Sequence, residues 1–118
     1  MVWATDANAG LNSATASSTI ASTTSGTNST LVGGTAGYNT GVTSSQAGGT
    51  GTVTVAAPFV GGTAKGGGLD TSLRPLATSA GTADTAVLTL TNNVAIGATT
   101  PAAADYTDTI TVIGAGLF

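Results

Sequence analysis

Apolar and polar residues alternate one for one in several segments of this chain, which is the period of a β-strand with one buried face. The alternation is clear in residues 50–60 and 106–113, where valine or isoleucine alternates with threonine. Residues 85–97 alternate on both sides of Asn92-Asn93, and we expect a hairpin there because asparagine tolerates the positive φ of a tight turn. The predicted core takes the apolar residues of these strands: Val53, Val55, Leu88, Leu90, Val94, Ile96, Ile110 and Val112.

The remaining segments contain fewer large apolar residues. Residues 1–30 are crowded with serine and threonine, and we interpret them as an extended arm or edge strand; a flexible stalk or glycosylated linker is the alternative. Glycines in residues 31–50 predict turns between short extended pieces, and residues 61–82 predict a long exposed loop. We therefore divide the chain into an N-terminal arm or donor strand, residues 1–30, and a β-sandwich domain, residues 31–118.

Composition narrows the classes of function. Ala, Gly, Ser and Thr make up 74 of the 118 residues, while His, Cys and Glu are absent. Few general bases, activated nucleophiles or metal ligands remain, so we expect neither an enzyme nor a cofactor. The net charge of −3, with only two cationic residues, argues against nucleic acid as a partner. No apolar run is long enough to span a bilayer.

The store of large apolar side chains is small for a chain of this length. Val, Leu, Ile and Phe number 23, and burying all of them does not offset the conformational entropy that ordering the chain costs. Neighbouring subunits, a donated strand or a bound ion would supply the difference. Only 6% of the residues are charged and β-branched residues are abundant, a combination that favours an ordered assembly over disorder.

The C-terminal segment resembles part of a known family. Residues 101–112 end in Asp105-Tyr106-Thr107-Asp108-Thr109-Ile110-Thr111-Val112, which resembles the closing strand of spore coat U domains and of the related archaic chaperone–usher pilins. The resemblance implies an incomplete immunoglobulin-like sandwich that is completed by a strand from the next subunit, with the donor strand within residues 1–30. The chain departs from the family in lacking its cysteine pair and in continuing after Val112 as Ile-Gly-Ala-Gly-Leu-Phe.

Two kinds of site are suggested by single residues. Calcium takes about six to eight oxygen ligands, and Asp84, Asp105 and Asp108 are weak candidates to supply some of them. The favoured interpretation is that these aspartates form turns and flank strands, so we expect no metal and keep calcium as the alternative. Asn28-Ser29-Thr30 fits the N-glycosylation sequon, which makes Asn28 a candidate for a glycan.

The sequence thus predicts an all-β protein, an immunoglobulin-like or jelly-roll-like sandwich completed by a strand from a neighbouring subunit. The predicted function is that of a structural subunit of an extracellular filament, pilus or surface layer, in which identical subunits join by β-strand addition. The alternatives are a monomeric secreted adhesin or carbohydrate-binding sandwich, and a Thr-rich ice-binding surface. We expect assembly to be carried by residues of the N-terminal arm and the last strand: Val2, Trp3, Leu11, Ile20, Thr107, Thr109, Ile110, Thr111, Val112 and Ile113.

Overall fold

The computed structural model describes residues 1–116 and confirms the all-β prediction. Its elements are β1 (Val2–Asp6), β2 (Gly10–Ser13), β3 (Ser18–Ala21), β4 (Asn28–Thr30), β5 (Gly37–Ser45), β6 (Val53–Val55), the 3-10 turn η1 (Ala57–Phe59), β7 (Lys65–Gly67), β8 (Arg74–Ser79), β9 (Val87–Ala95) and β10 (Ile110–Gly114). Within residues 1–116, no helix is long and apolar enough to cross a membrane.

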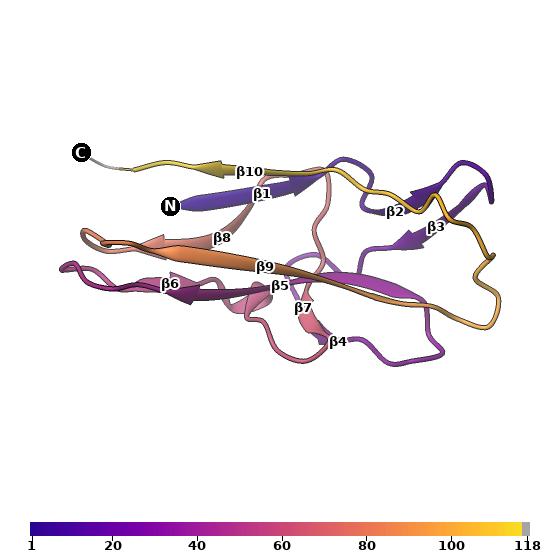
Figure 1. Cartoon of the computed structure of the whole chain (residues 1–118), viewed down its shortest axis with the longest axis horizontal. Coiled ribbons are helices and arrows are strands. Elements are labelled where there is room, and N and C mark those ends of the chain that lie inside the picture. The colour runs from indigo at the N-terminus through magenta and orange to yellow at the C-terminus, as the bar shows by residue number, and fades with distance from the viewer. Residues whose placement is uncertain (117–118) are drawn as a thin grey trace.

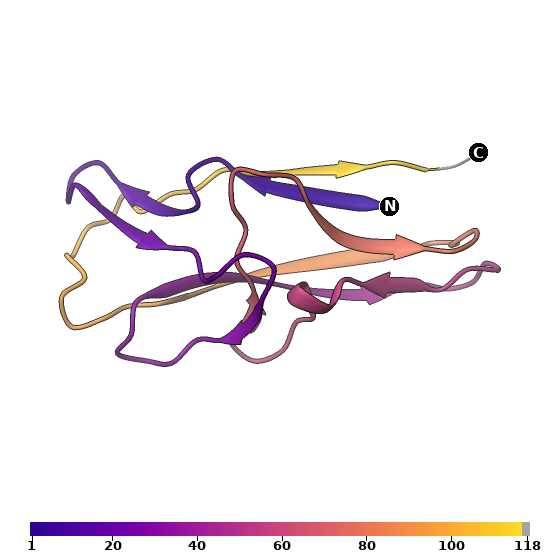
Figure 2. The same ribbon diagram turned by 180° about the vertical axis from the view of Figure 1, so that it is seen from behind.

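The strands form two four-stranded antiparallel sheets and one hairpin (Figures 1 and 2). One sheet has the order β10-β1-β8-β6, the other has the order β4-β7-β5-β9, and β2 pairs with β3. The molecule is elongated, with extents of 49 × 23 × 21 Å. Both termini of the described chain lie on the β1–β10 pair, where the Met1 amino group donates to the Ala115 carbonyl oxygen over 2.8 Å.

The N-terminal residues differ from the expected separate arm, because β1 is an inner strand of the first sheet. It pairs with β10 on one side, from Val2 opposite Gly114 to Asp6 opposite Ile110, and with β8 on the other. Its alternation explains the position: Ala4 and Asp6 face inward and are fully buried, while Trp3 and Thr5 face outward. Residues 1–30 therefore form β1 to β4 of the same fold as the rest of the chain.

The hairpin expected in residues 85–97 is instead one continuous strand, β9, which pairs along its whole length with β5. Asn92 and Asn93 lie within the strand, opposite Thr40 and Asn39. Their amides find partners across the pair: Asn92 Oδ1 accepts from Thr40 Oγ1 over 2.8 Å, and Asn93 Nδ2 donates to Asn39 Oδ1 over 2.9 Å. These cross-strand hydrogen bonds satisfy the two side-chain amides within the strand, so the asparagines do not need a turn to find polar partners.

The long exposed loop expected in residues 61–82 contains two strands, β7 and β8, and two buried leucines. The glycines at its start allow backbones to approach closely. A Cβ added at Gly68 would overlap the carbonyl oxygen of Thr23, and one at Gly66 would overlap the backbone of Thr40. The glycine run is therefore a packing feature of the second sheet and not a flexible turn.

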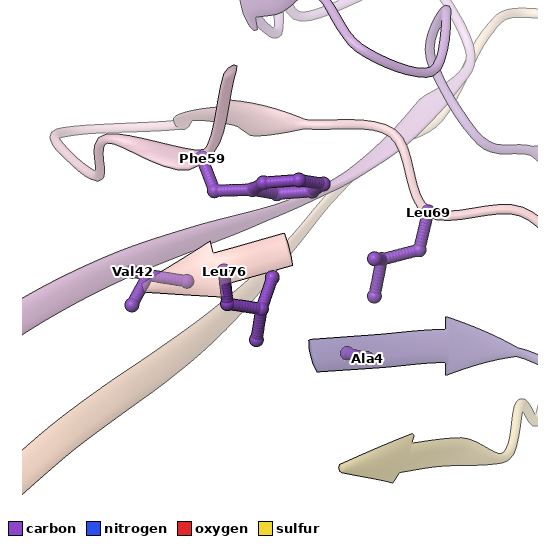
Figure 3. Packing of buried hydrophobic residues seen from close by; sticks show 5 residues of the cluster. All are labelled: Ala4, Val42, Phe59, Leu69 and Leu76. Atoms are coloured by element: carbon purple, nitrogen blue, oxygen red, sulfur yellow. The ribbon is translucent and has the colours of Figure 1, made fainter. Parts of the chain in front are cut away.

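The centre of the core is built from Ala4, Val42, Phe59, Leu69 and Leu76, all at most 2% exposed (Figure 3). Of the predicted core residues, Val55, Leu88, Leu90 and Ile110 pack against this cluster and are partly buried. Val53 is likewise half-buried. Three others depart from the prediction: Val94, Ile96 and Val112 are 53%, 63% and 48% exposed.

Candidate functional site

The candidate site lies along the free edges of the two sheets. Within the described chain, β9 pairs only with β5 and β10 pairs only with β1, so each has one side without a neighbouring strand. β9 has nine residues and β10 has five, whereas the other marginal strands, β4 and β6, have three each. A free edge presents unpaired N–H and C=O groups that can pair with another strand. The longest template of this kind is β9.

Apolar side chains on these two strands face the interior without being covered. Val112 lies opposite the fully buried Ala4 and therefore shares its inward face, yet Val112 is 48% exposed. On β9, Val94 lies opposite Tyr38, which is 4% exposed, while Val94 itself is 53% exposed. Both strands thus turn core-type residues toward a side on which the sandwich is open.

Two cavities open between the sheets along β9. The first, of about 190 Å³, is mostly apolar and includes Val2, Val53, Ala77 and Leu88 in its lining. The second, of about 380 Å³, is lined by Leu11, Tyr38, Asn92, Val94, Tyr106, Thr107, Asp108 and Ile110. We call the two cavities and the exposed inward-facing residues Val94 and Val112 the open-edge groove.

The second cavity has one carboxyl group in its lining, that of Asp108, which neighbours the fully buried carboxyl group of Asp6. Asp6 is fully buried, and its Oδ1 accepts hydrogen bonds from the backbone N–H groups of Asn8 (2.7 Å) and Ala9 (2.8 Å). Asp108 Oδ1 accepts from the N–H of Thr109 over 2.7 Å, while its buried Oδ2 has no hydrogen-bond partner. Burial, together with the neighbouring Asp6, raises the pKa of Asp108. Burial and the same carboxyl groups raise the pKa of Tyr38.

The three calcium candidates do not come together. Asp84 lies in the turn between β8 and β9 and exchanges backbone hydrogen bonds with the β5–β6 turn at Gly48. Asp105 accepts from Ser13 Oγ over 2.5 Å and from the N–H and hydroxyl of Thr15 over 2.9 Å each, and these bonds lower its pKa to about 2. Among residues 1–116, no three His, Cys, Asp or Glu side chains gather as a metal site.

The expected assembly residues are distributed over several environments. Val2 and Leu11 line the two cavities of the groove, whereas Ile20 is 3% exposed and belongs to the interior. Ile110 and Val112 face inward, while Thr111 and Ile113 face outward beside Thr5 and Trp3. Thr107 and Thr109 precede β10 and bind by backbone hydrogen bonds to Asn12 and Ala7.

The glycan candidate Asn28 is half-buried in β4. Its Nδ2 donates to the carbonyl oxygens of Pro58 and Val60, both over 2.9 Å. A sugar on this nitrogen would take the place of one of its two N–H donors, so at least one of these hydrogen bonds would be lost.

Sequence reasoning missed Asp6 and Tyr38. Neither belongs to a strongly alternating segment, and they enter the site only through long-range pairing: Asp6 lies opposite Ile110, and Tyr38 opposite Val94. The sequence places each of these residues in or next to a short extended segment. A short extended segment does not indicate which residue of another strand will lie opposite it.

Comparison with models of protein families, with curated proteins and with solved structures found no match to this chain. The fold and the site therefore define the protein only by class: an all-β sandwich with one open side.

Proposed function

We propose that this protein is a non-catalytic structural subunit of an extracellular filament, pilus or surface layer, and that identical subunits join by β-strand addition. The observation that carries the proposal is the open-edge groove, in which Val94 and Val112 face inward but are about half exposed. In strand addition, main-chain hydrogen bonds give affinity and alternate side chains enter pockets. The groove offers both elements, a free strand edge and apolar cavities.

A second copy of the chain is the partner that fits the distribution of edges. β9 and β10 are the free margins of the two sheets on the groove side, and β4 and β6 are the opposite margins. Contact between the groove side of one subunit and the other margin of the next is head-to-tail. Contacts of this kind generate rings or open filaments.

Low charge supports an extracellular role for such a subunit. Only 6% of the residues are charged, so free strand edges are protected by little electrostatic repulsion. This is a hazard in a concentrated cytosol but an advantage in a fibre. We therefore place the protein outside the cell or at its surface.

The test is a pair of matched double variants. Val94→Lys with Val112→Lys puts charge on the inward face of both edge strands, and we expect it to abolish filaments or higher oligomers that the unmodified protein forms. Thr89→Lys with Thr91→Lys puts the same charge on the outward face of β9, and we expect assembly to persist. Negative-stain microscopy and sedimentation measure both.

Folding of the two variants is checked by thermal unfolding. All four positions are substantially exposed, so we expect each substitution to change stability by only about 0.5 kcal/mol. The proposal is wrong if the unmodified protein stays monomeric at high concentration, or if the inward-facing variant assembles as well as the control.

A second candidate function rests on the outer face of the first sheet. Trp3 lies in register with Ile113 on β10 and Pro75 on β8, and forms with them a row across three strands. Trp3 is half-buried, and its two neighbours in this row, Ile113 and Pro75, are exposed. A flat aromatic row with hydroxyls beside it, here Thr5 and Thr111, suits the apolar face of a sugar ring. This favours a monomeric secreted adhesin or carbohydrate-binding module.

The discriminating experiment is binding to insoluble polysaccharide, with cellulose and chitin as the probes. If the row is a sugar platform, Trp3→Ala is expected to lower retention at least tenfold, while Thr89→Ala on the other sheet leaves it unchanged. Retention that does not respond to Trp3→Ala would remove this candidate.

A further inference from the structure

We infer that Asp6 and Asp108 form a proton-dependent latch in the wall of the open-edge groove. In the closed state Asp108 carries a proton and donates it toward Asp6, which holds residues 105–109 against β1. When the proton is lost, two carboxylates face each other and this segment loosens. The inference concerns the regulation of the groove, and only its consequence for assembly rests on the proposed function.

The register brings the two carboxyl groups to one face. Asp6 lies directly opposite Ile110, and Asp108 is two residues before Ile110, so its side chain points to the same side as those of Ile110 and Asp6. The N–H of Ala7 donates to the carbonyl oxygen of Thr109 over 3.0 Å, which fixes the backbones next to the pair. Diagonal neighbours of this kind are within reach of each other's side chains.

The hydrogen bonds assign the two roles. Asp6 is fully buried and two backbone N–H groups donate to its Oδ1, so it serves as the acceptor. Within residues 1–116, the buried Asp108 Oδ2 has no partner at hydrogen-bond distance, although the Tyr38 hydroxyl also faces Asp108 and opposes the rise in its pKa. A proton on that oxygen would satisfy it and would remove one of two charges that the site cannot compensate.

Within the described residues 1–116, no cationic group offsets the charge of the pair. The groups that face Asp108 are Asp6 from β1 and Tyr38 from β5, and Tyr106 lines the same cavity. Arg74 forms an ion pair with Asp70, and Lys65 is exposed on β7. The raised pKa of Asp108 agrees with this environment.

The direction of the pH effect follows from that shift. A folded-state pKa above the unfolded value of about 3.9 means that the latch contributes its full stability below about pH 4. The contribution is lost as pH rises through the folded-state pKa. The latch is therefore closed in acid and released toward neutral pH.

Strand addition would act on the same pair. Asp108 and Tyr38 line the second cavity beside Val94 and Ile110, so a strand seated there would exclude water from the Asp108 carboxyl group. Excluding water raises the cost of the second charge. Assembly would consequently take up a proton and would be stronger at acidic pH.

The test is the pH dependence of melting for the full chain and for Asp108→Asn, whose amide can donate to Asp6 without a charge. We expect the melting temperature of the unmodified protein to fall by about 4–8 °C between pH 4 and pH 8 relative to Asp108→Asn. Asp84→Asn, at a carboxyl group in the β8–β9 turn, is the control and should follow the unmodified protein. Equal pH dependence in the unmodified protein and Asp108→Asn would overturn the latch.

A second measurement keeps the inference testable if Asp108→Asn does not fold. Carboxyl carbon resonances of the unmodified protein, followed by NMR, report the Asp108 titration directly; a midpoint at or below about 3.9 contradicts the latch. Filament yield between pH 4 and pH 8 separates the two proposals. If Asp108 titrates as expected but the protein never forms filaments, only the proposed function is wrong. If the protein forms filaments but Asp108 has no raised titration midpoint, only the latch is wrong.

Discussion

A chain that lacks residues 1–6 is expected to be unfolded at 25 °C. The deletion removes β1, which pairs with β10 on one side and with β8 on the other. It leaves β10 without any partner strand in its sheet and uncovers the core beside Ala4, including Leu76, which is fully buried in the intact protein. The loss is comparable with the whole stability of a small domain, about 5–15 kcal/mol. Far-UV circular dichroism and amide dispersion in NMR spectra measure the result.

A synthetic peptide of residues 1–8 provides the control for this deletion. If the slot between β10 and β8 is what the truncated chain lacks, adding the peptide in excess should restore the spectrum of the folded protein. A truncated chain that melts like the full-length protein would contradict the placement of β1. Loss of filaments after removal of residues 1–6 would therefore not be evidence for strand donation between subunits. The deletion removes an inner strand of the subunit's own sheet, so the subunit itself would no longer fold.

The alternation of apolar residues and threonines predicted the strand character of much of the chain but not which residues make the centre of the core. The sequence predicts β6 and β10 because an apolar residue stands at every second position, at Val53 and Val55 in β6 and at Ile110 and Val112 in β10. Alternation reports that a strand has two different faces. It does not report whether another sheet covers the apolar face, which is why Val112 is predicted as core and is found half exposed.

Part of the core centre comes from segments in which proline or glycine interrupts the alternation of apolar and polar residues. Phe59 follows Pro58 in a 3-10 turn, and Leu69 follows three glycines. Neither segment has a period that a sequence analysis can count. Both are positioned by close backbone approaches, such as that of Gly68 to Thr23, which depend on the fold as a whole.

The residues of the candidate site are also brought together by pairing between strands that are far apart in the sequence. Asn92-Asn93 has the local composition of a turn, and only its pairing with β5 keeps it in a strand. In the same way, Asp6 and Asp108 are far apart in the sequence and meet through the β1–β10 register. Local propensity is a weak guide where tertiary pairing satisfies the polar groups. The open edge itself is a property of strand order, which no single segment encodes.

Replacing Phe59 with alanine is expected to cost about 3–5 kcal/mol of unfolding free energy, the range for deleting a buried phenylalanine. Phe59 is 1% exposed and packs with Val42, Leu69 and Leu76 (Figure 3). Its ring also approaches the backbone at Gly67, where an added Cβ would lie 3.0 Å from two ring carbons. Urea unfolding measures the change in free energy, and the variant should have a much lower midpoint or no folded baseline.

The neighbouring residue supplies the matched control, since Val60 is 42% exposed and Val60→Ala should cost no more than about 0.5 kcal/mol. The contrast between adjacent positions tests whether the small cluster around Phe59 holds the two sheets together. A chain with only 23 large apolar residues has few others to compensate for its loss. If Phe59→Ala costs less than about 1 kcal/mol, the stability of the subunit must come mainly from strand pairing, and the open-edge groove would then be a weaker argument for completion by a neighbour.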